Sequence, residues 1–223
     1  MAYPASVVRR LDERMVTIDG GPGSGGPLEG VYVPARDGEY RVDHDAGGAV
    51  VAAPHPLYGG AMDSPVVNEL AHACAQSGFS SLRFNWRGVG ASAGAPSGEA
   101  ADADADYRAA LAQLGETIPG PLLACGYSFG AAAALRVGRG EKRVERFILV
   151  APPPALLPAD PFAGLERPLL VLTGARDELA PAAALEPLVE AAPGARLEVV
   201  SRADHFFLAG LADVGRLAAT WLE

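Results

Sequence analysis

Short apolar runs alternate with helix-like segments through most of the chain after residue 48. The strand candidates are GAVVAA, FSSLRFNW, PLLACGY, RFILVA, PLLVLTG and RLEVVS. Helical periodicity occupies Ser64 to Gln76, Ala100 to Leu114, Gly130 to Val137, Ala182 to Ala191, and Phe207 to Trp221. Short apolar runs bounded by helices are typical of strands that are buried on both faces. The pattern therefore predicts a doubly wound α/β fold with a mostly parallel sheet.

The first 53 residues follow a different pattern, with short strands and no helix between them. The strand candidates are Val7 to Ile18, Leu28 to Pro34 and Ala49 to Ala53, and the Gly-rich GGPGSGG separates the first two. Too little chain precedes this Gly-rich stretch to bury a core of its own, so we expect a hairpin loop and not a domain linker. We expect antiparallel N-terminal strands within a single domain that spans residues 1–223.

The composition is that of a globular protein with an acidic surface. Apolar residues make up 49% and charged residues 20%, and 27 acidic against 18 basic residues give a formal net charge of -9. Such a field repels phosphate backbones and anionic lipid surfaces, so we expect neither nucleic acid nor a membrane as a partner. No apolar run approaches the ~20 residues that cross a bilayer, and the start MAYPASVVRRLDER lacks the apolar middle of a secretion signal, which predicts a cytoplasmic protein. Cys74 and Cys125 lack zinc-ligand spacing and are expected to be buried, reduced thiols.

The pattern G-x-S-x-G occurs twice, as GASAG around Ser92 and as GYSFG around Ser128. A nucleophile elbow needs a strand that runs directly into the serine and a helix that starts directly after it. Ser128 meets both conditions, because PLLACGY precedes it and FGAAAALRV follows it. Ser92 follows a Gly-rich loop and precedes AGAPSG, which cannot continue as a helix. Ser128 is therefore the predicted nucleophile.

Two other patterns suggest cofactors but lack the required context. GVGASA matches the relaxed dinucleotide fingerprint G-x-G-x-x-A, yet a helix should begin within that motif, and here the chain continues through Pro96 to Gly98. Asp43 and Asp45 flank His44, but neighbours along an extended strand face opposite ways. We therefore expect neither a nucleotide cofactor nor a metal ion.

A serine nucleophile requires a base, and the base requires a group that fixes its tautomer. His205 lies in SRADHFF, directly after a strand candidate, and is the preferred base; His72, in a predicted helix, is a weaker candidate. Asp177 occupies the equivalent loop of LLVLTGARDEL and is the preferred acid, with Glu178 as its neighbour and rival. The order Ser, acid, His along the chain matches that of one known triad arrangement.

The loop APHPLYGG follows an early strand, where the second donor of an oxyanion hole is expected. Pro56 has no N–H group, which leaves the N–H of Leu57, or alternatively that of Tyr58, beside the N–H of Phe129. The side chain of His55 is expected to brace this loop.

The stretches PHPLYGG, RFNWRGVGASAG, GYSFG, GARD and ADHFF, taken in order, resemble the α/β-hydrolase superfamily over essentially the whole chain. More specifically, the sequence resembles a small, capless bacterial subfamily akin to dienelactone hydrolase. The resemblance implies acyl-transfer hydrolysis without a metal or an organic cofactor, with Ser128, Asp177 and His205 as the triad. Dienelactone hydrolase has a cysteine in the elbow where this chain has serine, so its own substrate is not implied.

The connection APPPALLPADPFAGLERP is rich in proline and has no long amphipathic pattern, which predicts no large cap domain. An open, small pocket follows, with His55, Tyr58 and Trp86 among its expected substrate-binding residues. The predicted function is hydrolysis of small or medium acyl esters, with a small-molecule acyl substrate. The alternatives are a peptidase, lactonase or thioesterase with the same triad, and a non-catalytic scaffold that binds a small molecule or a protein; no pattern indicates an oligomeric state.

Overall fold

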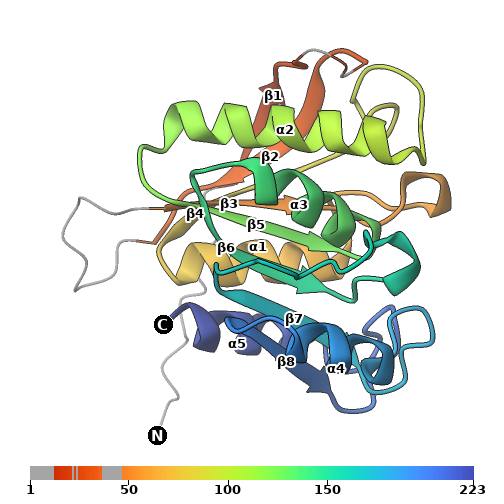
Figure 1. Cartoon of the computed structure of the whole chain (residues 1–223). Coiled ribbons are helices and arrows are strands. Elements are labelled where there is room, and N and C mark those ends of the chain that lie inside the picture. Colours follow the sequence, from red (N-terminus) through yellow and green to blue (C-terminus); the bar gives the residue numbers. More distant parts are fainter. Residues whose placement is uncertain (1–12, 22, 24, 37–46) are drawn as a thin grey trace, which may run out of the picture.

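The computed structural model describes residues 13–21, 23, 25–36 and 47–223. Within them, eight strands form one twisted sheet, which Figure 1 shows between layers of helices. Their order across the sheet is β1-β2-β4-β3-β5-β6-β7-β8. The strands are β1 (Arg14–Ile18), β2 (Leu28–Val33), β3 (Gly47–Ala52), β4 (Phe79–Phe84), β5 (Leu122–Tyr127), β6 (Val144–Val150), β7 (Leu169–Gly174) and β8 (Ala195–Val200).

The sheet is parallel from β4 to β8, and the two N-terminal strands are antiparallel to their neighbours. β1 pairs with β2, and β2 pairs with β4, both in the antiparallel sense. Every residue of β3, β4, β5 and β7 is buried, as expected for apolar runs covered on both faces. Both predictions, the mostly parallel sheet and the antiparallel N-terminal strands, are confirmed.

The helices are α1 (Pro65–Gln76), α2 (Ala100–Thr117), α3 (Phe129–Gly140), α4 (Ala182–Glu190) and α5 (Leu211–Leu222), with short 3₁₀ turns η1 (Pro56–Tyr58) and η2 (Pro154–Leu156). The chain moves from β3 to β4 in one direction across the sheet and then back past β3 to β5. Because such crossovers are right-handed, α1 and α2 cover opposite faces. α5 packs beside α1, and α3 packs beside α2. The reversal creates a switch point between β3 and β5, where the loops after these strands diverge and a crevice can form.

Several predicted boundaries differ from those observed. The last helix begins at Leu211 and not at Phe207, because Phe207 has a φ of 52° and Gly210 a φ of 86°. The Asp204 carboxylate accepts the N–H groups of Phe206 and Leu208, at 3.1 and 3.3 Å, and so closes a tight turn where the sequence predicts helix. Of the predicted first strand, the structure assigns only β1, and residues 7–12 lie outside the described range.

The connection from β6 to β7 contains η2 and turns, and no cap domain is inserted there. This confirms the prediction from its proline content. In the described part of the chain, no helix combines the length and the apolar character that a bilayer span requires.

Candidate active site

Ser128 lies in a tight turn between the end of β5 and the start of α3. Its φ of 55° and ψ of -118° place a residue with a side chain in the left-handed half of backbone space, which a nucleophile elbow tolerates. Glycines allow the close approach on both sides: a Cβ on Gly126 would lie 2.3 Å from the Gly130 oxygen, and a Cβ on Gly130 would lie 2.5 Å from the Ala53 oxygen. The sequence GYSFG is therefore explained by backbone packing at the elbow.

The three residues of the predicted triad lie in one hydrogen-bonded row. Ser128 Oγ lies 2.9 Å from His205 Nε2, and His205 Nδ1 lies 2.8 Å from Asp177 Oδ2. Ser128, His205 and Asp177 are 8%, 7% and 4% exposed, so water competes little for these bonds. With Nδ1–H directed at the carboxylate, Nε2 is free to accept the proton of the serine hydroxyl.

The Asp177 carboxylate is held in place by backbone groups as well as by the histidine. Its Oδ1 accepts the N–H of Leu179 at 2.9 Å and the N–H of Ala180 at 2.7 Å. Hydrogen bonds of this kind fix the orientation of the carboxylate. Glu178, the rival acid, is exposed to solvent.

Tyr127 supports His205 in a way that sequence reasoning missed. Its hydroxyl donates a 2.7 Å hydrogen bond to the His205 carbonyl oxygen, and the two rings have centroids 5.7 Å apart. Burial raises the pKa of Tyr127, and the charges of Asp177 and Asp204 raise it further, so the hydroxyl remains a donor. The available signal was an aromatic residue with a polar tip at the end of a buried strand, a type that usually finds a partner.

The predicted oxyanion donors differ in their present partners. Phe129 occupies the first position of α3, where a backbone N–H has no carbonyl within the helix to bond. The Leu57 N–H donates to His55 Nδ1 at 3.2 Å, and the Tyr58 N–H donates to the His55 carbonyl oxygen at 3.1 Å. Burial lowers the pKa of His55, which favours the neutral ring that such an acceptor role needs. Both candidate second donors thus have local acceptors here.

The His55 ring lies in an aromatic cluster on the elbow side of this loop. Its centroid is 4.6 Å from that of Phe129 and 4.7 Å from that of Tyr58. Trp86 is only 1% exposed, and its Nε1–H donates to the carbonyl oxygens of Ala53 and Pro54 at 3.1 and 3.0 Å. Trp86 therefore braces the loop from the core, and its contact with substrate stays a prediction.

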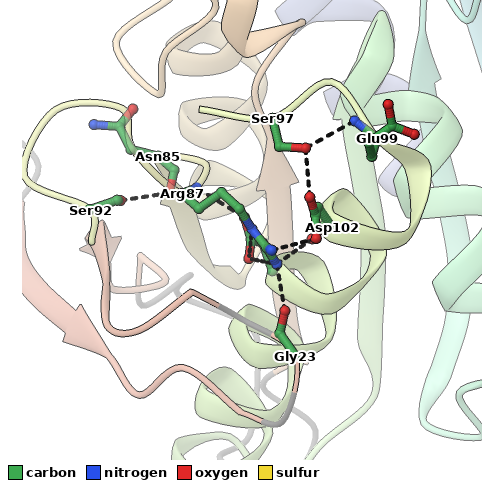
Figure 2. A network of polar contacts seen from close by, with 8 residues as sticks. Gly23, Asn85, Arg87, Ser92, Ser97, Glu99 and Asp102 are labelled. Carbon is green, nitrogen blue, oxygen red and sulfur yellow. Dashed lines mark hydrogen bonds and ion pairs between the residues drawn. The ribbon is translucent and has the colours of Figure 1, made fainter. Parts of the chain in front are cut away.

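Ser92, the other serine in a G-x-S-x-G pattern, is part of a structural loop. Its hydroxyl accepts the Glu29 N–H and donates to the Asn85 carbonyl oxygen, both at 2.9 Å, so neither of its contacts is a histidine. In the same loop, Arg87 reaches Asp102 and the carbonyl oxygen of Gly23 (Figure 2). Arg87 also donates to Asp106 Oδ1 at 2.8 Å, and the Ser97 hydroxyl donates to Asp102 Oδ2 at 2.6 Å. No helix begins between Gly88 and Glu99, so the dinucleotide-like motif lies in the turns before α2.

The remaining candidate ligands lie apart from the triad's contacts. His72, on α1, contacts the Glu13 carboxylate at 3.2 Å, and His44 lies outside the described residues. Cys74 and Cys125 are buried free thiols, as predicted, and burial raises the pKa of Cys125. No group of three or more potential metal ligands is found in the part of the chain that the structure describes.

Comparison with known proteins gives one family and several relatives. The family model described as serine aminopeptidase, S33 matches residues 48–165. The uncharacterized protein RP471 of Rickettsia prowazekii (strain Madrid E) is 31% identical over 199 residues, which cover 83% of this chain and 79% of that protein. An alpha-beta serine hydrolase homologue from Coxiella burnetii has a TM-score of 0.81 and 28% identity, covering 94% of this chain and 97% of that one. An α/β serine hydrolase without a lid from Xanthomonas campestris has a TM-score of 0.78 and 28% identity, covering 93% and 92%.

Proposed function

This chain belongs to the serine aminopeptidase, S33 family of the α/β-hydrolase superfamily, and within that family we propose that it hydrolyses small or medium carboxylic esters with Ser128 as nucleophile. The observation that carries the proposal is the buried row from Ser128 Oγ through His205 to Asp177, with successive distances of 2.9 and 2.8 Å. A scaffold that only binds a ligand has no need of such a row.

In the first half of the reaction, Ser128 Oγ attacks the substrate carbonyl while His205 Nε2 accepts the hydroxyl proton. Asp177 holds the Nδ1–H and stabilises the imidazolium that forms. His205 then protonates the leaving alcohol, and an acyl-enzyme remains. In the second half, His205 accepts a proton from the water that attacks the acyl carbonyl, and it returns this proton to Ser128 Oγ as the bond between Oγ and the acyl carbon breaks and the acid leaves.

Negative charge develops on the carbonyl oxygen in both halves. The N–H of Phe129, at the start of α3, supplies one donor, since helix N-termini carry free N–H groups and a partial positive charge. The N–H of Leu57 supplies the second, after it exchanges its bond to His55 Nδ1 for one to the oxyanion. Removing a single donor of this kind typically costs ~100-fold or more in rate.

We propose an ester and not a peptide with a free N-terminus as the substrate, because the two aspartates nearest the site already have hydrogen-bond partners within the protein. An aminopeptidase must pair the free ammonium group of its substrate with an anion close to the serine. Asp177 binds His205, and Asp204 accepts the N–H groups of Phe206 and Leu208. Among the acids of these two loops, Asp204 Oδ2 and Glu178 are left for a substrate ammonium group, and Glu178 is exposed, where solvent weakens an ion pair.

We further propose that residues 1–223 act as one domain on a small-molecule substrate. β1 and β2 extend the sheet that carries the site, and the C-terminal α5 packs beside α1. The formal net charge of -9 favours neither nucleic acid nor an anionic membrane as a partner.

The test combines active-site labelling with a substrate panel. The wild type should be labelled by a fluorophosphonate probe and should hydrolyse p-nitrophenyl acetate and butyrate, whereas Ser128→Ala should do neither. Ser92→Ala is the matched control, and it should retain both properties if the protein is folded. Faster turnover of aminoacyl p-nitroanilides than of esters would favour a peptidase, and the absence of labelling would favour a non-catalytic scaffold.

A further inference from the structure

Large apolar side chains are exposed chiefly in the loops around Ser128. Eight such side chains are exposed among the described residues, and six of them belong to loops that follow strands of the parallel sheet. We call these six the apolar collar: Leu57, Tyr58, Leu156, Leu179, Phe206 and Leu208. The carboxyl ends of parallel strands share one edge of a sheet, so these loops gather at the edge that carries the serine (Figure 1).

The apolar collar flanks the serine on both sides. Leu57 and Tyr58 follow β3, on one side of β5, while the other four members follow β6, β7 and β8, on the opposite side. Its members are also close to the site along the chain. Leu179 comes two residues after Asp177, and the ring of Phe206 lies 5.8 Å from that of His205.

The size of this surface exceeds what single exposed apolar residues produce. Tyr58 is 87% exposed and Leu208 is 86% exposed, and the six members together expose an area on the order of 600 Å². Scattered exposed apolar residues are ordinary, but six of them in loops after the parallel strands share the edge of the sheet that carries the serine, which makes that edge the candidate binding surface. The other two exposed large apolar side chains, Met15 and Val199, lie on strands β1 and β8 and not in these loops.

The charged groups in the same loops do not form a site for a charged substrate. Asp204 closes its own turn. The exposed charged residues of these loops are of mixed sign: Arg176 and Arg202 are basic, and Asp63, Asp160, Glu166 and Glu178 are acidic. None of the buried side-chain atoms without a hydrogen-bond partner in the described residues belongs to these loops. A site that selects a charged group would instead present a desolvated, unpaired counter-charge beside the serine.

We infer that the apolar collar binds a bulky, uncharged apolar group of the substrate, so that the preferred esters join a small acyl group to an aryl or branched alkyl alcohol. The inference rests on the proposed function, because a small or medium acyl group leaves the alcohol portion to cover the collar. Removing apolar surface from water at the collar then contributes to kcat/KM without any polar recognition of the alcohol.

Three acetates with similar phenol leaving groups test the inference: phenyl acetate, 4-tert-butylphenyl acetate and 4-(trimethylammoniomethyl)phenyl acetate. Each kcat/KM is divided by the rate of alkaline hydrolysis, which removes differences in intrinsic reactivity. We expect the tert-butyl ester to be preferred over both others. The cationic ester is the strict comparison, because a net charge of -9 attracts it.

The variant Leu156→Ser/Leu208→Ser removes two members of the collar, and Met15→Ser/Val199→Ser removes the two exposed apolar side chains outside it. We expect the preference for the tert-butyl ester over phenyl acetate to fall about tenfold in the first variant, as loss of partial burial of an alkyl group predicts. The second variant should keep the wild-type preference, and thermal unfolding should show that both are folded.

An equal preference in the two variants, or a faster reaction with the cationic ester, would overturn the inference while leaving esterase activity established. If the wild type hydrolyses none of the three esters, the proposed function fails. Binding of 4-tert-butylphenol, followed by NMR in wild type and both variants, then decides the inference separately: weaker binding in Leu156→Ser/Leu208→Ser alone supports it, and equal binding rejects it.

Discussion

Replacing Tyr127 with phenylalanine removes one hydroxyl group from beneath the histidine of the proposed triad. That hydroxyl donates a 2.7 Å hydrogen bond to the His205 carbonyl oxygen, and Tyr127 is buried. The substitution leaves every charge of the site in place. Tyr127→Phe therefore tests whether the backbone position of His205 matters for catalysis.

The magnitude follows from the loss of one buried bond. Leaving the His205 carbonyl without its donor should cost about 1–3 kcal/mol of stability, and a chain of this size loses about 2–4 °C in Tm for each kcal/mol. A looser carbonyl also lets His205 Nε2 move away from Ser128 Oγ. Since a displacement of ~1 Å can cost about 100-fold, we expect a partial loosening to lower kcat about tenfold. KM should change little, because Tyr127 lies beneath the site.

Tyr107→Phe is the matched control. The Tyr107 hydroxyl is also fully buried and hydrogen-bonded, to the carbonyl oxygens of Val50 and Cys125 and to the Cys125 N–H, but it touches no triad residue. Ester hydrolysis is measured below the melting temperature of both variants, together with thermal unfolding and the pH dependence of kcat/KM. Wild-type kcat in Tyr127→Phe, or an equal loss in Tyr107→Phe, would refute a positioning role.

Buried charge, proton transfer and acyl length give three further tests. Arg87→Met leaves the buried Asp106 carboxylate without its cation and should lower the free energy of unfolding by about 3–5 kcal/mol. Arg196→Met breaks an exposed ion pair and should change the free energy of unfolding by less than about 1 kcal/mol. Urea unfolding measures both changes, and equal values would contradict the argument. The kcat/KM for ester hydrolysis should fall on acidification, because a protonated His205 cannot accept the Ser128 proton. EDTA should have no effect on this rate. Inhibition by EDTA that a divalent metal reverses would indicate another mechanism. Across p-nitrophenyl esters of increasing acyl length, kcat/KM should reach a plateau at long chains, because each CH₂ beyond an open pocket gains little of the ~0.8 kcal/mol that full burial gives. A steady rise of kcat/KM would indicate a deeper acyl site.

The sheet and the proximity of Ser128, Asp177 and His205 could be predicted because both follow from local patterns. Runs such as PLLACGY and PLLVLTG are fully apolar, which is the signature of strands covered on both faces, and β5 and β7 are buried throughout. Once these strands are parallel, their carboxyl ends share one edge. Ser128 follows β5 directly, and Asp177 and His205 lie in the loops after β7 and β8, so their meeting at that edge could be expected without any knowledge of side-chain contacts.

The turn after β8 could not be predicted, because it depends on hydrogen bonds that a period of 3.6 residues does not reveal. The apolar residues Phe206, Phe207 and Leu208 fit a helical pattern, but the Asp204 carboxylate binds two of their N–H groups and Phe207 takes a positive φ. The contact between Tyr127 and His205 joins residues 78 positions apart, and no local pattern marks it.

The cytoplasmic location that the sequence predicts stays a prediction.

The role proposed for the Leu57 N–H requires that a donor engaged in the resting structure can still serve the transition state. A neutral substrate carbonyl offers the Leu57 N–H no stronger bond than His55 Nδ1 does, so exchanging one acceptor for the other gains little in the ground state. A hydrogen bond to an ionised oxygen is roughly twice as strong as one between neutral groups. The exchange therefore becomes favourable only as negative charge develops on the substrate oxygen. An interaction that strengthens in this way raises kcat and not merely affinity for substrate. The aromatic contacts that His55 makes with Phe129 and Tyr58 would hold the ring in place while the N–H turns from one acceptor to the other.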